Sequence, residues 1–145
     1  MKYAIVAVLI VAVLLSVGIL AGQTKARVTF VDHAKVAAAA SGEDLAKGSD
    51  FTVMMMKRTG VGHVEVHDKE TDTFYVLDGS AILVTGGTMA GGHATKPNQQ
   101  QGSSIQGGQT YSLTKGDVIV IPAGTPHWFK QVPKSISYYV VKIVK

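Results

Sequence analysis

Short β-prone segments, separated by turns that contain glycine or proline, fill the chain from residue 51 almost to its end. These segments are residues 51–58, 63–67, 73–77, 80–85, 110–113, 118–121, 127–131 and 135–143. Many short strands with a turn after each are typical of antiparallel barrels and sandwiches. The sequence therefore predicts an all-β fold of barrel or sandwich type.

Two stretches between these strands contain strong turn signals. Asp78-Gly79 predicts a tight hairpin that joins 73–77 to 80–85. Residues 86–110 are rich in Gly, Gln, Ser and Asn, and nine of the 16 glycines lie between Gly79 and Gly116. This composition predicts a long loop with one short strand near Ser104–Gln106. The loop, which contains His93, is either a mobile solvated segment or a lid over the mouth of a barrel.

One short helix is predicted ahead of the strands, after a first strand at 27–31. Asp32 stands at an N-cap position, alanine dominates residues 33–40, and Ser41-Gly42 follows. His33 is expected to be a surface or packing residue of this helix.

The N-terminal segment differs in composition from the rest of the chain. Lys2 is followed by residues 3–21, which contain no charged side chain. A positive start followed by an apolar run is typical of a secretory signal. The run is also just long enough, at about 19 residues, to span a bilayer as an uncleaved anchor, and a buried core helix is a third interpretation. We expect residues 1–26 to be a signal peptide or membrane anchor and residues 27–145 to be one domain. Both of the first two readings export that domain, either to the periplasm or medium or to the outer face of a membrane.

Composition excludes several classes of function. The chain has no cysteine, which excludes a disulfide framework, a thiolate nucleophile and a cysteine-ligated zinc site. From Arg27 onward, 12 basic residues face 10 acidic ones without any basic run, so nucleic-acid binding has little support. Phosphate-binding glycine loops, a serine nucleophile elbow and a dinucleotide fingerprint are also absent from the sequence.

Two strands carry side chains that could perform chemistry. Alternation along residues 63–67 places His63, Glu65 and His67 on one face, which is either a solvent-facing stripe or the lining of a metal-binding barrel. Farther on, Pro122 and the glycine at 124 form a tight turn that fixes where His127 projects at the start of the next strand. His127 could instead be a packing residue beside Trp128.

Taken together, these segments resemble the cupin superfamily. Its second motif is matched at every spacing by Gly116, Pro122, Gly124 and His127. Its first motif is matched in spacing by Glu65-Val66-His67, then Asp72, then Gly79. The resemblance covers residues 61 to about 141.

The resemblance implies a cupin-type β-barrel, that is, a double-stranded β-helix or jelly roll, holding one divalent metal. The positions that match ligands are Glu65, His67, Asp72 and His127. Glu65 replaces a histidine of the family motif and Asp72 replaces a glutamate. This harder donor set favours Mn or Fe over Cu, and it also leaves open a weaker metal site or none. Gln131 stands where the family often has asparagine.

His63 is a reserve ligand, since it lies about 13 Å from His67 along an ideal strand and both could bind one ion only if the strand bends. Phe74 and Val76 share a face with Asp72 and are expected, with Trp128, to form the wall of the pocket. Tyr75 and Leu77 face away from it.

Three functions follow from these features. The first is a metal-dependent cupin enzyme, of oxygenase, isomerase or lyase type, that uses Mn, Fe, Ni or Zn on a small molecule. The second is a barrel that binds a small molecule or sugar without metal or turnover. The third is a structural role in which outward aromatics such as Tyr75 form a homodimer.

Overall fold

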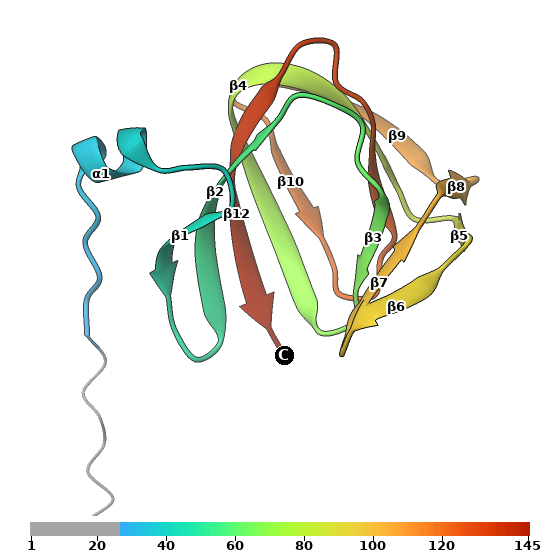
Figure 1. Cartoon of the computed structure of the whole chain (residues 1–145), viewed down its shortest axis with the longest axis horizontal. Coiled ribbons are helices and arrows are strands. Elements are labelled where there is room, and N and C mark those ends of the chain that lie inside the picture. The colour runs from blue at the N-terminus through green and yellow to red at the C-terminus, as the bar shows by residue number, and fades with distance from the viewer. Residues whose placement is uncertain (1–26) are drawn as a thin grey trace, which may run out of the picture.

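The computed structural model describes residues 27–145, which form an antiparallel barrel with one short helix beside it (Figure 1). The predicted signal peptide or anchor lies outside the described residues. Between residues 27 and 145, no helix has the length and apolarity that crossing a membrane requires.

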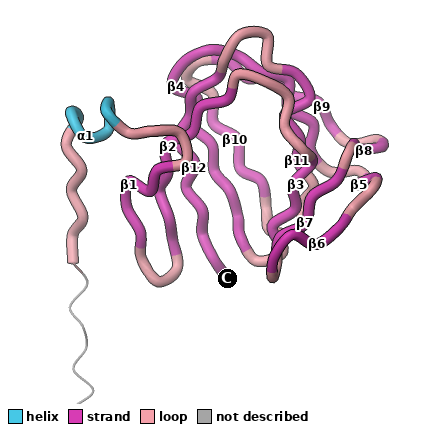
Figure 2. The backbone as a smooth tube through the Cα atoms, viewed as in Figure 1, coloured by secondary structure: helices cyan, strands magenta, loops and turns pink. Residues whose placement is uncertain are grey.

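Twelve strands and one helix make up the described chain, and strands dominate it (Figure 2). In chain order the elements are α1 (His33–Ala38), β1 (Glu43–Lys47), β2 (Phe51–Arg58), β3 (Val64–His67), β4 (Glu70–Thr85), β5 (Thr88–Ala90), β6 (His93–Lys96), β7 (Gln99–Gly102), β8 (Ser104–Gln106), β9 (Gln109–Thr114), β10 (Val118–Ile121), β11 (His127–Gln131) and β12 (Ile136–Val144). The all-β prediction is confirmed.

The long strand β4 connects the two walls of the barrel. Its first half pairs with β12 and β10, and its second half pairs with β11 and β9. The wall on one side has the order β1, β2, β12, β4 and β10. The other wall continues from β4 through β11, β3, β7 and β6.

The hairpin predicted at Asp78-Gly79 is wrong, because both residues lie inside β4. Pairing with β12 shifts register here: Ser137 faces Asp78 but Tyr138 faces Val76, which leaves one extra residue in β4. Gly79 has a φ of 81°, and a Cβ there would lie 2.0 Å from the Ser135 carbonyl oxygen. The extra residue is Leu77, so a β-bulge precedes Gly79 and bends β4 from one wall into the other.

The bulge also changes which residues of β4 face the interior. Before it the buried positions include the even-numbered Phe74 and Val76, and after it the buried positions include the odd-numbered Ala81 and Leu83. One inserted residue reverses the alternation, so both halves of β4 present side chains to the barrel interior.

The predicted helix is confirmed, although it is shorter than expected. The Asp32 side chain accepts a hydrogen bond of 2.9 Å from the Lys35 amide, as its N-cap position implies, and the helix ends at Ala38. The strand predicted at 27–31 is wrong, because this segment pairs with no strand and leaves Val28 and Phe30 95% and 85% exposed.

The glycine-rich stretch was predicted as a long loop, and it instead contains four short strands, β5 to β8. The one short strand expected there, Ser104–Gln106, is confirmed as β8 and pairs with β5. β7 pairs with β3, which places Gln99 opposite His67. Pairing with neighbours, rather than apolar alternation, holds these polar segments in strand conformation.

An aromatic cluster lies at the centre of the hydrophobic core. Phe74 of β4, Phe129 of β11 and Tyr138 of β12 have ring centroids 4.9 to 5.8 Å apart. The remaining buried members of this core are Val76, Ala81, Leu83, Leu113, Ile121, Ile136 and Val140. The cluster joins both walls and supports the cavity described below.

The bulge gives a first prediction. Gly79→Ala should lower the free energy of unfolding by about 3 kcal/mol or more, because the new Cβ adds a backbone clash to the cost of a positive φ. Gly116→Ala is the matched control: its φ is 92°, but a Cβ there meets nothing within 4 Å, so only about 1–2 kcal/mol should be lost. Urea unfolding measures both, and equal losses would contradict the role given to the bulge.

Candidate functional site

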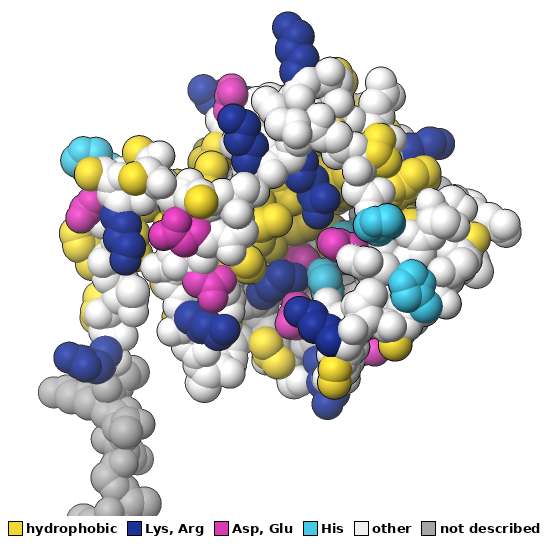
Figure 3. Space-filling model, viewed as in Figure 1, with side chains coloured by type: hydrophobic (Ala, Val, Ile, Leu, Met, Phe, Trp, Pro, Cys, Tyr) yellow, Lys and Arg dark blue, Asp and Glu magenta, His cyan; other side chains and the backbone are white. Residues whose placement is uncertain are grey.

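A cavity of about 420 Å³ lies between the two walls of the barrel. Figure 3 shows it as a central hollow surrounded by acidic, basic and histidine side chains, with apolar side chains behind them. Residues from seven strands line it, namely Asp44, Lys47, Thr52, Met54, Met56, Arg58, Glu65, His67, Glu70, Asp72, Phe74, Thr95, Lys96, Gln99, Gln100, Gln101, Tyr138, Val140 and Lys142.

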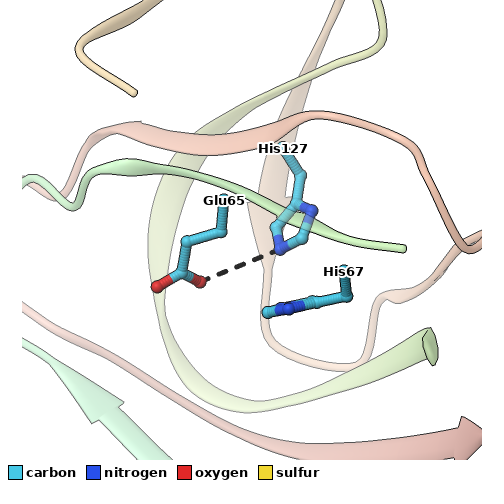
Figure 4. Close-up of side chains that lie close together, drawn as sticks. All are labelled: Glu65, His67 and His127. Atoms are coloured by element: carbon cyan, nitrogen blue, oxygen red, sulfur yellow. Dashed lines mark ion pairs between the residues drawn. The ribbon is translucent and has the colours of Figure 1, made fainter. Parts of the chain in front are cut away.

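Of the four residues that match cupin ligand positions, Glu65, His67 and Asp72 line this cavity, and His127 lies next to them. His67 Nε2 is 3.4 Å from Asp72 Oδ2, and His127 Nε2 is 4.0 Å from the same oxygen. His127 Nε2 is also 3.9 Å from Glu65 Oε2, a pair drawn in Figure 4. The rings of His67 and His127 have centroids 5.1 Å apart.

Strand pairing explains why these side chains meet. His127 opens β11 directly opposite Glu65 of β3, and alternation along β3 places His67 on the same face as Glu65. The intervening residues Val64 and Val66 are buried on the other face. Asp72 reaches the site from β4 and, like His127, is almost fully buried.

In both His127 and His67, Nδ1 has a hydrogen-bond partner, and Nε2 is directed at the carboxylates. His127 Nδ1 lies 3.1 Å from the Thr125 carbonyl oxygen, which can only accept, so Nδ1 donates the proton and Nε2 keeps a lone pair. His67 Nδ1 contacts the Gln99 side-chain oxygen in the same way. Burial lowers the pKa of His127 although Thr125, Asp72 and Glu65 act to raise it, so the ring stays neutral at pH 7.

Lys142 is a member of the site that the sequence interpretation did not identify. Its Nζ donates to Asp72 Oδ1 at 2.9 Å, to Asp72 Oδ2 at 3.0 Å and to Glu70 Oε2 at 3.1 Å. Burial acts to raise the pKa of Glu70, but the hydrogen bond and charge of Lys142, with His67 and Gln99, lower it below its ordinary value. Alternation along β12 was the signal that could have identified it, because Lys142 lies on the same face of the strand as the buried Tyr138 and Val140.

Arg58 is a second cation in the cavity that sequence reasoning missed. Its Nε donates to the Tyr138 hydroxyl at 3.0 Å, its Nη2 lies 3.6 Å from Glu65 Oε2, and its guanidinium lies 4.8 Å from the Phe129 ring centroid. Burial raises the pKa of Tyr138 although Arg58 opposes this, so the phenol stays protonated at neutral pH. Three contacts thus hold Arg58 in one orientation.

Other residues that the sequence singled out lie elsewhere. Of the three residues expected to form the pocket wall, Phe74 lines the cavity, and Val76 lies in the hydrophobic core. Trp128 lies on the face of β11 opposite to His127, where its Nε1 donates to the Gly62 carbonyl at 2.8 Å. His63, His33 and His93 are exposed, and none belongs to a ligand cluster of the described chain. Glu70, which was not predicted, forms such a cluster with His67 and Asp72.

The donor set fits one divalent ion. Two ligands at about 2.0–2.2 Å from one ion have their donor atoms roughly 3–4.4 Å apart, and the separations of 3.4, 3.9 and 4.0 Å lie in that range. Glu65, Glu70 and Asp72 bring three formal negative charges to the ligand cluster, and Arg58 and Lys142 bring two positive ones, so these five residues sum to −1. The complete lining of the cavity is neutral, because Asp44, Lys47 and Lys96 add one negative and two positive charges. The carboxylates of the cluster can accept a cation.

Lys142 gives a second prediction. Lys142→Met should lower the free energy of unfolding by about 3 kcal/mol at neutral pH, because it leaves the buried Asp72 carboxylate without its cation. Lys47→Met is the control, since Lys47 and its partner Asp44 have side chains 68% and 43% exposed and should change stability by less than about 1 kcal/mol. Urea unfolding compares the two variants. An equal loss of unfolding free energy in both variants would show that the buried Lys142–Asp72 ion pair adds no more stability than the exposed Lys47–Asp44 pair.

Comparison with known proteins supports the same architecture. The family model described as Cupin matches residues 24–143. No curated protein matches the chain.

Solved structures with similar folds come from several organisms. A Bacillus halodurans protein is 17% identical, with a TM-score of 0.51 over 70% of this chain and 68% of that one. KdgF from Halomonas is also 17% identical, with a TM-score of 0.51 over 71% of this chain and 78% of that one. The cupin domain of Cnp3 from Schizosaccharomyces pombe is 14% identical, with a TM-score of 0.51. That alignment covers 71% of this chain and 63% of the other, which is less than two thirds. Identities this low establish a shared fold and nothing about a shared ligand. With a family match that spans most of its length and a barrel of the corresponding fold, the chain belongs to the cupin family.

Proposed function

We propose that this protein is an exported cupin barrel that holds one divalent metal ion and binds a small molecule in the cavity beside it. The observation that carries the proposal is the convergence of two Nε2 atoms and two carboxylates, with the closest separation 3.4 Å. The ligands are Glu65, His67, Asp72 and His127. Two imidazoles with two carboxylates favour Mn or Fe, and also suit Ni or Zn.

A bound ion supplies Lewis acidity and a fixed point for orienting a small molecule. The residues of the chain perform the supporting tasks. Thr125 and Gln99 orient the two histidines through Nδ1, and Lys142 holds Asp72 and Glu70 in place. Neutral His127 offers its lone pair at pH 7, because burial lowers its pKa.

The cavity suits a small molecule with both polar and apolar parts. Its volume of about 420 Å³ falls within the range of about 300–1,000 Å³ that is usual for ligand sites. Met54 and Met56 of β2 provide an apolar wall, whereas Gln99 and Gln101 of β7 provide amides. Arg58, held by Tyr138 and Phe129, adds a fixed positive group to the lining.

Export belongs to the proposal because of the N-terminal sequence. Lys2 followed by the uncharged residues 3–21 is typical of a signal peptide or anchor. Mass spectrometry of the protein isolated from its host measures whether residues 1–26 are removed, and recovery of the intact protein from the cytoplasm would contradict export.

Metal binding is the third prediction. Protein purified without chelators, or titrated with Mn²⁺ by calorimetry, should bind one equivalent, and His127→Ala should weaken that binding about 100-fold or more because it removes a buried ligand. His93→Ala is the matched control, since His93 is exposed in β6 and should leave affinity unchanged.

Two results would contradict the prediction of metal binding at this site. Failure to bind Mn, Fe, Ni or Zn would contradict the metal site. Equal affinity in His127→Ala and the wild type would place the ion elsewhere.

A metal-free binding barrel is the second candidate, and one observation favours it. Both carboxylates among the proposed ligands already face a cation, with Lys142 2.9 Å from Asp72 and Arg58 3.6 Å from Glu65. The site is therefore partly neutralised without an ion. Once a ligand is found by screening small molecules, ligand affinity that is unchanged by EDTA and by His127→Ala would favour this candidate over the first.

A further inference from the structure

The ammonium group of Lys142 lies among carboxylate oxygens in the way that a metal ion would. Its Nζ is 2.9 and 3.0 Å from the two oxygens of Asp72 and 3.1 Å from Glu70 Oε2. Strand register explains the contact, because Lys142 of β12 pairs directly with Asp72 of β4, and cross-strand partners have adjacent side chains. The Lys142 side chain is 20% exposed and that of Asp72 is 3% exposed, so little water competes for these contacts.

The residues around this ammonium group form a second group of metal-ligand type. His67, Glu70 and Asp72 each offer a donor atom, and these atoms lie within 4.8 Å of one another, as do those of Glu65, His67 and His127. The two groups share His67 but differ in their other members. The described residues therefore offer two positions for a cation, and the lysine already occupies the one between Asp72 and Glu70.

Asp72 lies between the two positions and can serve both. Its Oδ2 is 3.4 Å from His67 Nε2 and 4.0 Å from His127 Nε2, whereas its Oδ1 is 2.9 Å from Lys142 Nζ. A divalent ion beside the histidines can bind Oδ2 alone, because a carboxylate can coordinate through one oxygen. Oδ1 then stays with Lys142, so that ion does not have to displace the lysine.

Charge opposes a second ion while Lys142 is in place. The five charged residues of the ligand cluster sum to −1, so one divalent ion raises the sum to +1 and a second would raise it to +3. Without Lys142 the remaining four residues sum to −2, which two ions would change to +2. Like charges a few ångströms apart repel strongly in a partly buried site. Lys142 therefore disfavours a second ion both by its charge and by occupying the position.

We propose that Lys142 is a built-in cation that takes the place of a second metal ion and limits the cavity to a single one. This inference rests on the proposed function for the ion beside the histidines, but the position between Asp72 and Glu70 does not depend on that ion. Lys142 also lines the cavity, so a lysine rather than an ion meets a small molecule there. The residue thereby determines how many ions a bound molecule can contact.

Counting bound ions tests the proposal. In Mn²⁺ titration calorimetry, at free concentrations up to about 1 mM, Lys142→Met should bind one equivalent more than the wild type. Lys47→Met is the matched control, because Lys47 lines the same cavity but pairs with the exposed Asp44, and it should leave the count unchanged. Adding Glu70→Gln to Lys142→Met should remove the extra equivalent, because it takes away a carboxylate of the second position.

The outcomes separate this proposal from the proposed function. An unchanged count in Lys142→Met, or an equal gain in Lys47→Met, would overturn the proposal. A wild-type protein that binds no ion contradicts the proposed function instead. The proposal then still requires one equivalent in Lys142→Met that Glu70→Gln removes.

A measurement on the wild-type protein covers the case in which Lys142→Met does not fold. NMR of protein with isotope-labelled lysine should show slow hydrogen exchange for the Lys142 ammonium group, which contacts three oxygens, and fast exchange for that of Lys47, whose side chain is 68% exposed. Lys142→Arg assigns the signal by its loss, and the slow exchange should persist when Zn²⁺ is added. Exchange as fast as that of Lys47, with or without Zn²⁺, would show that the ammonium group does not hold this position and would overturn the proposal.

Discussion

The rest of this structure depends on one strand that belongs to two sheets. β4 is bonded on both edges along both halves, to β12 and β10 before the bulge and to β11 and β9 after it. The bulge at Leu77 bends the strand and reverses its alternation, so that Phe74 and Leu83 both reach the interior. Without that reversal one half of β4 would direct its apolar residues to solvent, and the barrel could not close around a single core.

Sequence patterns predicted the elements whose signals are local. Alternation identified most of the strands that line the barrel, and Asp32 identified the start of α1. The wrong predictions concern segments whose conformation depends on pairing with strands elsewhere in the chain. Asp78-Gly79 suits a hairpin turn, but its pairing with Ser137 and Ile136 of β12 keeps it within β4, next to the bulge at Leu77. Residues 27–31 have strand composition but no partner, whereas the polar β7 has a partner in β3.

The candidate site shows the same division between local and distant signals. Motif spacing singled out Glu65, His67, Asp72 and His127, and the structure brings these four together, although their role as ligands stays a prediction. Spacing could not identify Lys142, whose carboxylate partner Asp72 lies 70 residues away in the chain, or Arg58, which donates to Tyr138 80 residues away. Alternation directs both side chains inward, but these partners meet them only because the barrel closes.

These two cations determine how the site behaves with and without an ion. Lys142 contacts Asp72 and Glu70, and Arg58 contacts Glu65, in a cavity where Asp72 is 2% exposed, so the donor atoms are arranged before any metal arrives. The five charged residues of the ligand cluster sum to −1, and the complete lining, with Asp44, Lys47 and Lys96, is neutral. A divalent ion on the proposed ligands would therefore make the cavity positive. Because Arg58 stays fixed by Tyr138 and Phe129, a loaded cavity would favour a ligand with an anionic group more than the empty cavity does.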